Sequence, residues 1–262
     1  MNHFNTLHNY FLYLLKAKTK HGVHSPFIYH FVAEVLKDST AYPEYGPIRK
    51  TVKDLRQSRQ VIETADFGAS AGKDHHKTRT RTIGDIARKS PVSKKTGAKL
   101  FCIVRHNKPG YILELGTSFG ISTMYMALAN PASKIHTIEG CAASAAIASN
   151  NFNKHGLNNI ELHQGEFDNR LENVISKLPR LDFVYIDGNH RKEPTLKYFN
   201  ACLEKVHNET IMVFDDIHWS QGMEQAWKQI AAHKRVTASI DNFRLGIVFF
   251  RKELSRQQFV IR

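Results

Sequence analysis

Cysteine is scarce in this sequence: the 262 residues contain three, Cys102, Cys141 and Cys202, and these lie far apart. An odd, unclustered set excludes a disulfide framework and matches no zinc-binding spacing. Long apolar runs are lacking too, because no stretch approaches the roughly 20 residues that a membrane helix requires. The first 20 residues contain no hydrophobic core of the kind that secretory signals carry. These absences predict a cytoplasmic protein without membrane insertion.

Positive charge, by contrast, is abundant and unevenly distributed. The chain has 37 Lys and Arg against 24 Asp and Glu, which gives a formal charge of +13. Residues 1–110 hold 20 basic against 8 acidic residues, whereas residues 111–262 are nearly balanced. A basic surface can serve a nucleic acid, an anionic substrate or solubility, and the asymmetry alone does not choose among them.

Periodicity and composition divide the chain into three parts. Residues 1–60 repeat apolar side chains at helical spacing, with Ser25 and Pro26 as a helix-start signal, and predict a helical N-terminal extension or lid. Residues 61–96 predict a basic connector that is partly loop. Residues 97–262 predict the main domain, in which no internal repeat is visible.

In the main domain, predicted strands alternate with predicted helices. This alternation predicts a parallel sheet with right-handed crossovers. The last two strands have only residues 241–245 between them, so we expect them to pair as an antiparallel hairpin. The predicted fold is therefore an α/β, seven-stranded Rossmann-like sheet that closes with this hairpin. The seven strands are expected at residues 111–115, 134–138, 159–163, 182–186, 210–214, 236–240 and 246–251.

Acidic or Gly-rich segments follow five consecutive predicted strands. Ligands of an open parallel sheet bind beyond the carboxyl ends of its strands, so these segments predict a common ligand site. They comprise residues 114–120, 138–140, 164–168, 187–190 and 215–218.

Two glycines and one glutamate in this set indicate the ligand. Gly116 and Gly120 allow a tight turn that lets a ligand approach main-chain N–H groups at the start of the next helix. Glu139 lies 19 residues after Gly120, at the end of the next strand, where a carboxylate can accept both hydroxyls of a ribose. The pattern predicts an adenosine-containing cofactor.

Other segments imitate a cofactor or metal site. Residues 66–72 are also Gly-rich, but His, Lys and Arg follow them, so we interpret this loop as a flap bordering the site. His21 with His24, and His75 with His76, have ligand-like spacing. Because no carboxylate or cysteine accompanies them, we interpret these histidines as loop or capping residues.

The pattern Glu114-x-Gly116-x-x-x-Gly120 resembles the first motif of class I S-adenosylmethionine-dependent methyltransferases, whose seven-stranded sheet also closes with an antiparallel hairpin. Within that class, residues 181–190 and 213–216 are similar to the catechol O-methyltransferase-like branch. The resemblance covers about residues 97–251 and implies S-adenosylmethionine as cofactor, with Glu139 on the ribose. The cofactor contacts it implies are Glu114, Gly116, Thr117, Ser118, Gly120, Ser122, Glu139, Gly140, Gly165, Glu166 and Asp187.

The same resemblance implies a metal and a base. That branch holds a divalent metal on three residues that match Asp187, Asp215 and Asp216, the last an Asp where the branch has Asn. Three such oxygen donors suit Mg²⁺. Where the branch has a Lys, this chain has His190, which we predict as the general base beside Asp187, with His218 as a second candidate. In related enzymes without a metal, the Asp187 turn only shapes the site, and this alternative stays open.

The resemblance implies methyl transfer to a hydroxyl of a small molecule, with Mg²⁺ assistance as one variant. An RNA (tRNA) methyltransferase that uses the basic N-terminal part remains an alternative, as does a non-catalytic cofactor-binding module. A nicotinamide-dependent oxidoreductase is disfavoured, because Ser118 replaces the middle glycine of that motif. A homodimer is one interpretation of the apolar Phe11, Leu14 and Leu15.

Overall fold

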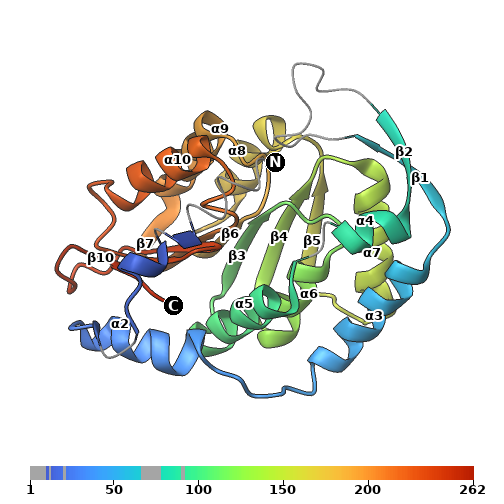
Figure 1. Ribbon diagram of the computed structural model, residues 1–262. Coiled ribbons are helices and arrows are strands. Elements are labelled where there is room, and N and C mark those ends of the chain that lie inside the picture. Colours follow the sequence, from blue (N-terminus) through green and yellow to red (C-terminus); the bar gives the residue numbers. More distant parts are fainter. Residues whose placement is uncertain (1–9, 12, 20–21, 66–77, 90–91) are drawn as a thin grey trace. The chain divides into compact units, whose positions relative to one another are not determined.

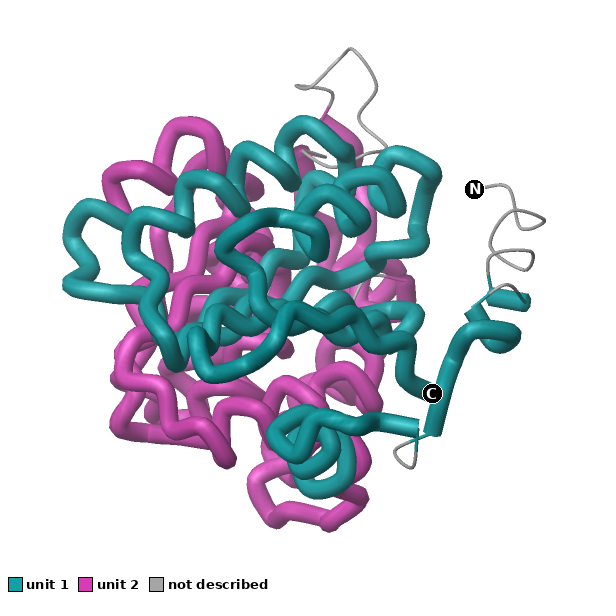
Figure 2. The backbone as a smooth tube through the Cα atoms, turned by 90° about the vertical axis from the view of Figure 1, so that its left-hand side faces the viewer, with its two compact units in different colours: residues 1–34, 175–262 teal, residues 35–174 magenta. Residues whose placement is uncertain are grey.

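The computed structural model describes residues 10–11, 13–19, 22–65, 78–89 and 92–262. The chain forms two compact units, coloured separately in Figure 2. Unit 1 comprises residues 1–34 and 175–262, and unit 2 comprises residues 35–174. The loop 66–72 and the histidines His21, His75 and His76, which the sequence singled out, lie outside the described residues.

Unit 2 is built on three parallel strands in the order β3, β4, β5, which run side by side in Figure 1. In β3, Ile112, Leu113 and Leu115 are fully buried, as is typical of a parallel strand covered on both faces. The elements are π-helical segment η2 (Phe31–Leu36), which begins in unit 1, α3 (Tyr45–Gln57), β1 (Val61–Ala65), β2 (Thr78–Thr82), α4 (Ile83–Lys89), α5 (Lys94–Asn107), β3 (Tyr111–Leu115), α6 (Ile121–Ala129), β4 (Lys134–Glu139), α7 (Ala142–Lys154), β5 (Ile160–Gln164) and α8 (Phe167–Lys177), which ends in unit 1.

The described part of the basic connector contains two strands and a helix. Strands β1 and β2 form an antiparallel pair in which Val61 lies opposite Thr82, and α4 follows directly. Alternating Thr and Arg in β2 leave three of its five residues exposed, so few apolar side chains mark this strand in the sequence. Helix α7 packs against β1, which ties the pair to the rest of unit 2.

Among the described residues of unit 1, five strands lie in the order β10-β8-β9-β7-β6. Strands β6 and β7 are parallel, and β9 is antiparallel to both β7 and β8, so the predicted C-terminal hairpin is confirmed. Strand β10 runs parallel to β8 and was not predicted. The elements are α2 (Pro26–His30), β6 (Leu181–Ile186), α9 (Lys192–Cys202), the 3₁₀ segment η4 (Leu203–Lys205), β7 (Val206–Phe214), α10 (Gln221–Ala231), β8 (Ala238–Asn242), β9 (Leu245–Phe249) and β10 (Gln257–Val260).

The segment from Ser25 to Phe31 packs on strand β9 within unit 1. As predicted, Ser25 caps α2 and accepts a hydrogen bond from the Ile28 N–H, with Pro26 in the first turn. Phe27 and Phe31 both meet the Phe249 ring edge-on, which anchors this segment to β9. Within the described part of the chain, no helix combines the length and the hydrophobicity needed to cross a membrane.

Candidate functional site

The loop between β3 and α6 has the tight geometry that its glycines predicted. Gly116 and Gly120 have φ of 104° and 81°, and Ser118 between them has φ of 49°. The Gly116 N–H donates to the Ile138 carbonyl at 3.0 Å, which fixes the loop to the end of β4. A non-glycine residue in this left-handed conformation is uncommon and is concentrated at binding sites.

Glu139, at the end of β4, holds this loop through its side chain. One carboxylate oxygen accepts the Ser118 N–H at 2.7 Å, and the other accepts the Cys141 N–H at 2.8 Å. Burial raises the pKa of Glu139, and the backbone donors only partly oppose the rise. The residue is partly exposed and each oxygen keeps a further lone pair, so the fixed carboxylate suits the two hydroxyls of a ribose.

The segment that follows β5 is hydrogen-bonded to the same glutamate. The Gly165 N–H donates to the Glu139 carbonyl at 2.8 Å, and Gly165 has φ of 138°. Glu166 begins the next turn, where its carbonyl accepts the N–H groups of Asn169 and Arg170. The structure therefore brings Gly116, Ser118, Glu139 and Gly165 to one end of the unit 2 strands.

Glu114 lies in a buried hydrogen-bond network together with two other predicted cofactor contacts, Thr117 and Ser122. Its side chain is fully buried, and its carboxylate accepts hydroxyl hydrogen bonds from Ser122 and Thr123 at 2.5 Å each and from Thr137 at 2.7 Å. Thr117 donates to Thr137 at 2.5 Å and extends the network. Glu114 thus holds the start of α6 against β3 and β4, and the Ser122 hydroxyl donates to it.

A substitution at Gly120 tests how strictly the loop depends on its geometry. A Cβ on Gly120 would lie 2.4 Å from a ring carbon of Phe152, in addition to the strained φ. We expect Gly120→Ala to lower the free energy of unfolding by about 2–4 kcal/mol, measured by urea denaturation. Gly46→Ala is the matched control, because nothing lies within 4 Å of its Cβ position in α3. The control should be neutral or slightly stabilising, and an equal loss in both variants would contradict the strained loop.

Three aspartates of unit 1 follow the ends of β6 and β7. The two strands pair Ile186 with Phe214, and the Asp215 N–H donates to the Ile186 carbonyl at 2.9 Å. Asp187 and Asp215 therefore follow neighbouring strand ends, as the sequence predicted. Asp216 comes next and has a left-handed φ of 52°.

Arg244, in the turn between β8 and β9, joins this cluster and was not predicted. Its Nε and Nη2 donate to the two oxygens of Asp215 at 2.9 and 3.0 Å, and its Nε lies 3.6 Å from Asp216. The Asp215 side chain is 0% exposed. Burial and the Asp187 carboxylate raise the pKa of Asp215, and the Arg244 guanidinium opposes that rise by stabilising the charged form.

This arrangement does not fit the Mg²⁺ that the resemblance implied. A cation bound by Asp187, Asp215 and Asp216 would need a carboxylate oxygen of each residue to face it. Both oxygens of Asp215 instead face the guanidinium. Arg244 supplies positive charge directly to Asp215.

His190 follows Asp187 in a strained turn. Asn189 and His190 have φ of 62° and 20°, and the Asn189 amide donates to the Tyr198 hydroxyl at 2.9 Å. The His190 Nε2 lies 3.5 Å from an Asp187 oxygen, and the other Asp187 oxygen accepts the Tyr185 hydroxyl at 3.1 Å. Burial by itself would lower the pKa of His190, but the hydrogen bond and charge of Asp187, with the neighbouring acids, raise it overall.

His218, the second candidate base, is held on both sides by carboxylates. Its Nε2 lies 2.9 Å from Asp241 and its Nδ1 lies 3.4 Å from Glu224, while its ring stacks on Phe243. Burial lowers the pKa of His218, but the two carboxylates outweigh it and raise the pKa overall. Because both ring nitrogens already face acids, His218 is less suited than His190 to take a proton from a substrate.

Parts of this sequence are similar to a known protein family and to individual known proteins. Residues 113–217 match the family described as a methyltransferase domain. The catechol O-methyltransferase of Niastella koreensis is 30% identical over 129 residues, or 48% of this chain and 58% of that protein. An uncharacterised protein of Acanthamoeba polyphaga mimivirus is 31% identical over 85 residues, or 31% of this chain and 38% of that protein. The chain thus spans less than two thirds of either relative.

Solved structures show the same fold at lower identity. The methyltransferase PaMTH1 of Podospora anserina, bound to SAH, has a TM-score of 0.61 at 16% identity and covers 88% of this chain and 97% of that one. The O-methyltransferase of Bacillus cereus in complex with SAH has a TM-score of 0.58 at 19% identity, with coverages of 84% and 96%. The predicted Rossmann-like α/β fold is therefore confirmed.

Proposed function

We propose that this chain, which contains a class I S-adenosylmethionine-dependent methyltransferase domain of the catechol O-methyltransferase-like branch, methylates a hydroxyl group of a small molecule. The observation that carries the proposal is the Glu139 carboxylate, which two backbone N–H groups hold beside the Gly116–Gly120 loop. A fixed carboxylate next to left-handed glycines is the arrangement that a ribose and its neighbouring groups require.

Unit 2 binds the methyl donor in this proposal. When bound, S-adenosylmethionine supplies a methyl group on a positively charged sulfur. Glu139 accepts the ribose hydroxyls, the loop at Gly116 and Ser118 lets the donor approach the main chain, and Gly165 with Glu166 borders the adenine. Glu114 acts indirectly, because its buried carboxylate fixes the first turn of α6 through Ser122 and Thr123.

In this proposal unit 1 provides the base that takes a proton from the acceptor. The His190 Nε2 faces Asp187, so Nδ1 takes the proton of the acceptor hydroxyl while Asp187 keeps the ring oriented. Arg244 compensates the buried charge of Asp215 and keeps the strand ends in place without a bound cation. In this proposal residues 1–60 select the acceptor, and residues 1–34 belong to the same unit as His190.

Calorimetric titration with S-adenosylmethionine and its demethylated product tests the donor site. We expect Glu139→Ala to weaken binding roughly 10- to 100-fold, because hydrogen bonds to a charged group contribute about 1.5–3 kcal/mol. Glu172→Ala removes the same charge from an exposed position of α8 and should leave the affinity unchanged. Equal affinity in wild type and Glu139→Ala would contradict the proposal.

Methyl transfer itself is tested with an acceptor. The name of the Niastella koreensis relative makes catechol the first hydroxyl compound to try. Conversion of catechol to its methyl ether by wild type, lost in Glu139→Ala, is the expected result. Donor binding without transfer to catechol or to a panel of phenols and alcohols would favour the non-catalytic alternative.

A further inference from the structure

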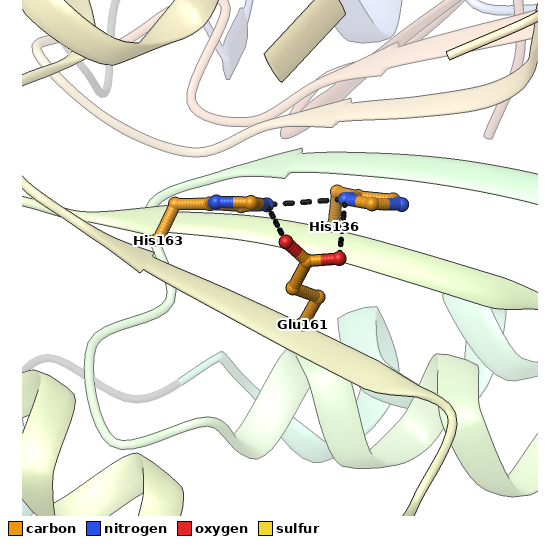
Figure 3. Close-up of side chains that lie close together, drawn as sticks. All are labelled: His136, Glu161 and His163. Carbon is orange, nitrogen blue, oxygen red and sulfur yellow. Dashed lines mark hydrogen bonds and ion pairs between the residues drawn. The ribbon is translucent and has the colours of Figure 1, made fainter. Parts of the chain in front are cut away.

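Three potential metal ligands meet on one face of unit 2. Strands β4 and β5 are parallel neighbours, and their register places His136 opposite Glu161. His163 lies two residues further along β5, and side chains two residues apart point to the same face of a strand. Figure 3 shows the two imidazoles and the carboxylate pointing toward one another.

The distances within this His136–Glu161–His163 cluster match those between ligands of one small cation. The His136 Nδ1 and the His163 Nε2 are 3.1 Å apart. One Glu161 oxygen, Oε2, lies 3.5 Å from the His136 Nδ1, and the other, Oε1, lies 3.6 Å from the His163 Nε2. Two atoms bound to Zn²⁺ at tetrahedral angles, each about 2.0–2.1 Å from the metal, are separated by roughly 3.3 Å. Each nitrogen thus lies at a ligand-like distance from the other nitrogen and from one of the two carboxylate oxygens, so a shared ion would need the carboxylate to turn one oxygen toward both nitrogens.

The surroundings of the cluster allow an ion to enter. The two imidazole side chains are 14% and 15% exposed, whereas Glu161 is 62% exposed. The rings are nearly parallel, with an interplanar angle of 11°. A hydrogen-bonded histidine pair beside a glutamate is the simpler interpretation. A hydrogen bond between the two histidines does not account for Glu161, whose two oxygens each lie beside one imidazole nitrogen.

We propose that His136, Glu161 and His163 form a binding site for a divalent transition-metal ion, with Zn²⁺ as the best match. Two imidazoles and one carboxylate are ligands that Zn²⁺ accepts readily and Mg²⁺ does not prefer. Three protein ligands leave the fourth position of a tetrahedral ion to water. The site is distinct from the acid cluster of unit 1 and does not depend on the proposed methyl transfer.

The ion would link β4 to β5 near the donor site. His136 precedes Glu139 by three residues on β4, and His163 lies two residues before Gly165, whose N–H bonds to the Glu139 carbonyl. Alternation places His136 on the face of β4 opposite to that of Thr137. The metal would thus link the two neighbouring strands on that face.

Titration of the metal-free full chain with Zn²⁺, followed by calorimetry, tests the site directly. Glu161→Gln is the main variant, because its exposed side chain can change without disturbing the core, and His163→Gln is the second. Each should weaken the tightest Zn²⁺ binding at least tenfold. His106→Gln, which changes an exposed histidine of α5, is the matched control and should bind as wild type does.

A second readout identifies the ligands without relying on affinity. Co²⁺ in place of Zn²⁺ should give the intense visible absorption of a tetrahedral site in wild type and in His106→Gln, and lose it in Glu161→Gln and His163→Gln. Unchanged affinity and spectrum in Glu161→Gln and His163→Gln would overturn the proposal. Donor binding measured in the same samples separates this outcome from failure of the methyltransferase assignment.

Discussion

Replacing Arg244 with alanine should lower the free energy of unfolding by about 3 kcal/mol, measured by urea denaturation near neutral pH. The loss follows because Asp215 is 0% exposed and both of its oxygens bond to this guanidinium. Removing one member of a buried ion pair leaves an uncompensated charge in a poorly solvated position. We expect the lower end of the usual range, because the Arg244 side chain is itself 44% exposed and water screens part of the interaction.

A double variant separates charge from packing. Combining Arg244→Ala with Asp215→Asn removes both charges, so most of the lost stability should return. If the double variant is as unstable as Arg244→Ala alone, the loss comes from packing of the arginine stem and not from the unpaired carboxylate.

The same variant tests the source of positive charge in the acid cluster. Added Mg²⁺ should leave the stability of wild type unchanged, because Arg244 already occupies both oxygens of Asp215. In Arg244→Ala, the acids lose their cation, and Mg²⁺ should restore part of the stability. Stabilisation of wild type by Mg²⁺ that disappears in Asp215→Asn would instead support the ligand set Asp187, Asp215 and Asp216.

Much of the fold was predictable because the strands carry strong periodic signals. Strand β3 was predicted with its observed bounds, and the hairpin of β8 and β9 follows from the short segment between two apolar runs. Strand β10 was missed, because Gln257–Val260 is short and half polar and pairs with a strand only through the tertiary fold. Local sequence contains no signal for such pairing.

The site was predictable where a motif marks it and not where pairing creates it. Gly116, Gly120 and Glu139 are recognisable from their spacing, and the structure brings them together. Arg244 carries no motif, because its role arises only when the turn between β8 and β9 lies beside Asp215. His136 and His163 are 27 residues apart, and only the parallel register of β4 and β5 makes them neighbours.

Replacing His190 with asparagine should lower kcat for methyl transfer by roughly 10²- to 10⁴-fold, the usual contribution of a positioned general base. The pH profile gives the sharper test. The carboxylate of Asp187 raises the pKa of His190 above its ordinary value of 6.5, in spite of burial. The imidazole accepts a proton only in its neutral form, so kcat/KM should rise with pH through this elevated pKa and then level off.

Replacing Asp187, the partner of His190, should shift the ascending limb of the kcat/KM profile along the pH axis. Asp187→Asn removes the charge that raises the pKa, while burial, which lowers it, remains, so the ascending limb should shift to lower pH. Direct titration of the His190 ring by NMR should show the same shift without a substrate. His218→Asn is the control, because Asp241 and Glu224 occupy its ring nitrogens and its loss should leave the limb in place. An ascending limb that survives in His190→Asn but vanishes in His218→Asn would reverse the two assignments, since each imidazole titrates beside different carboxylates.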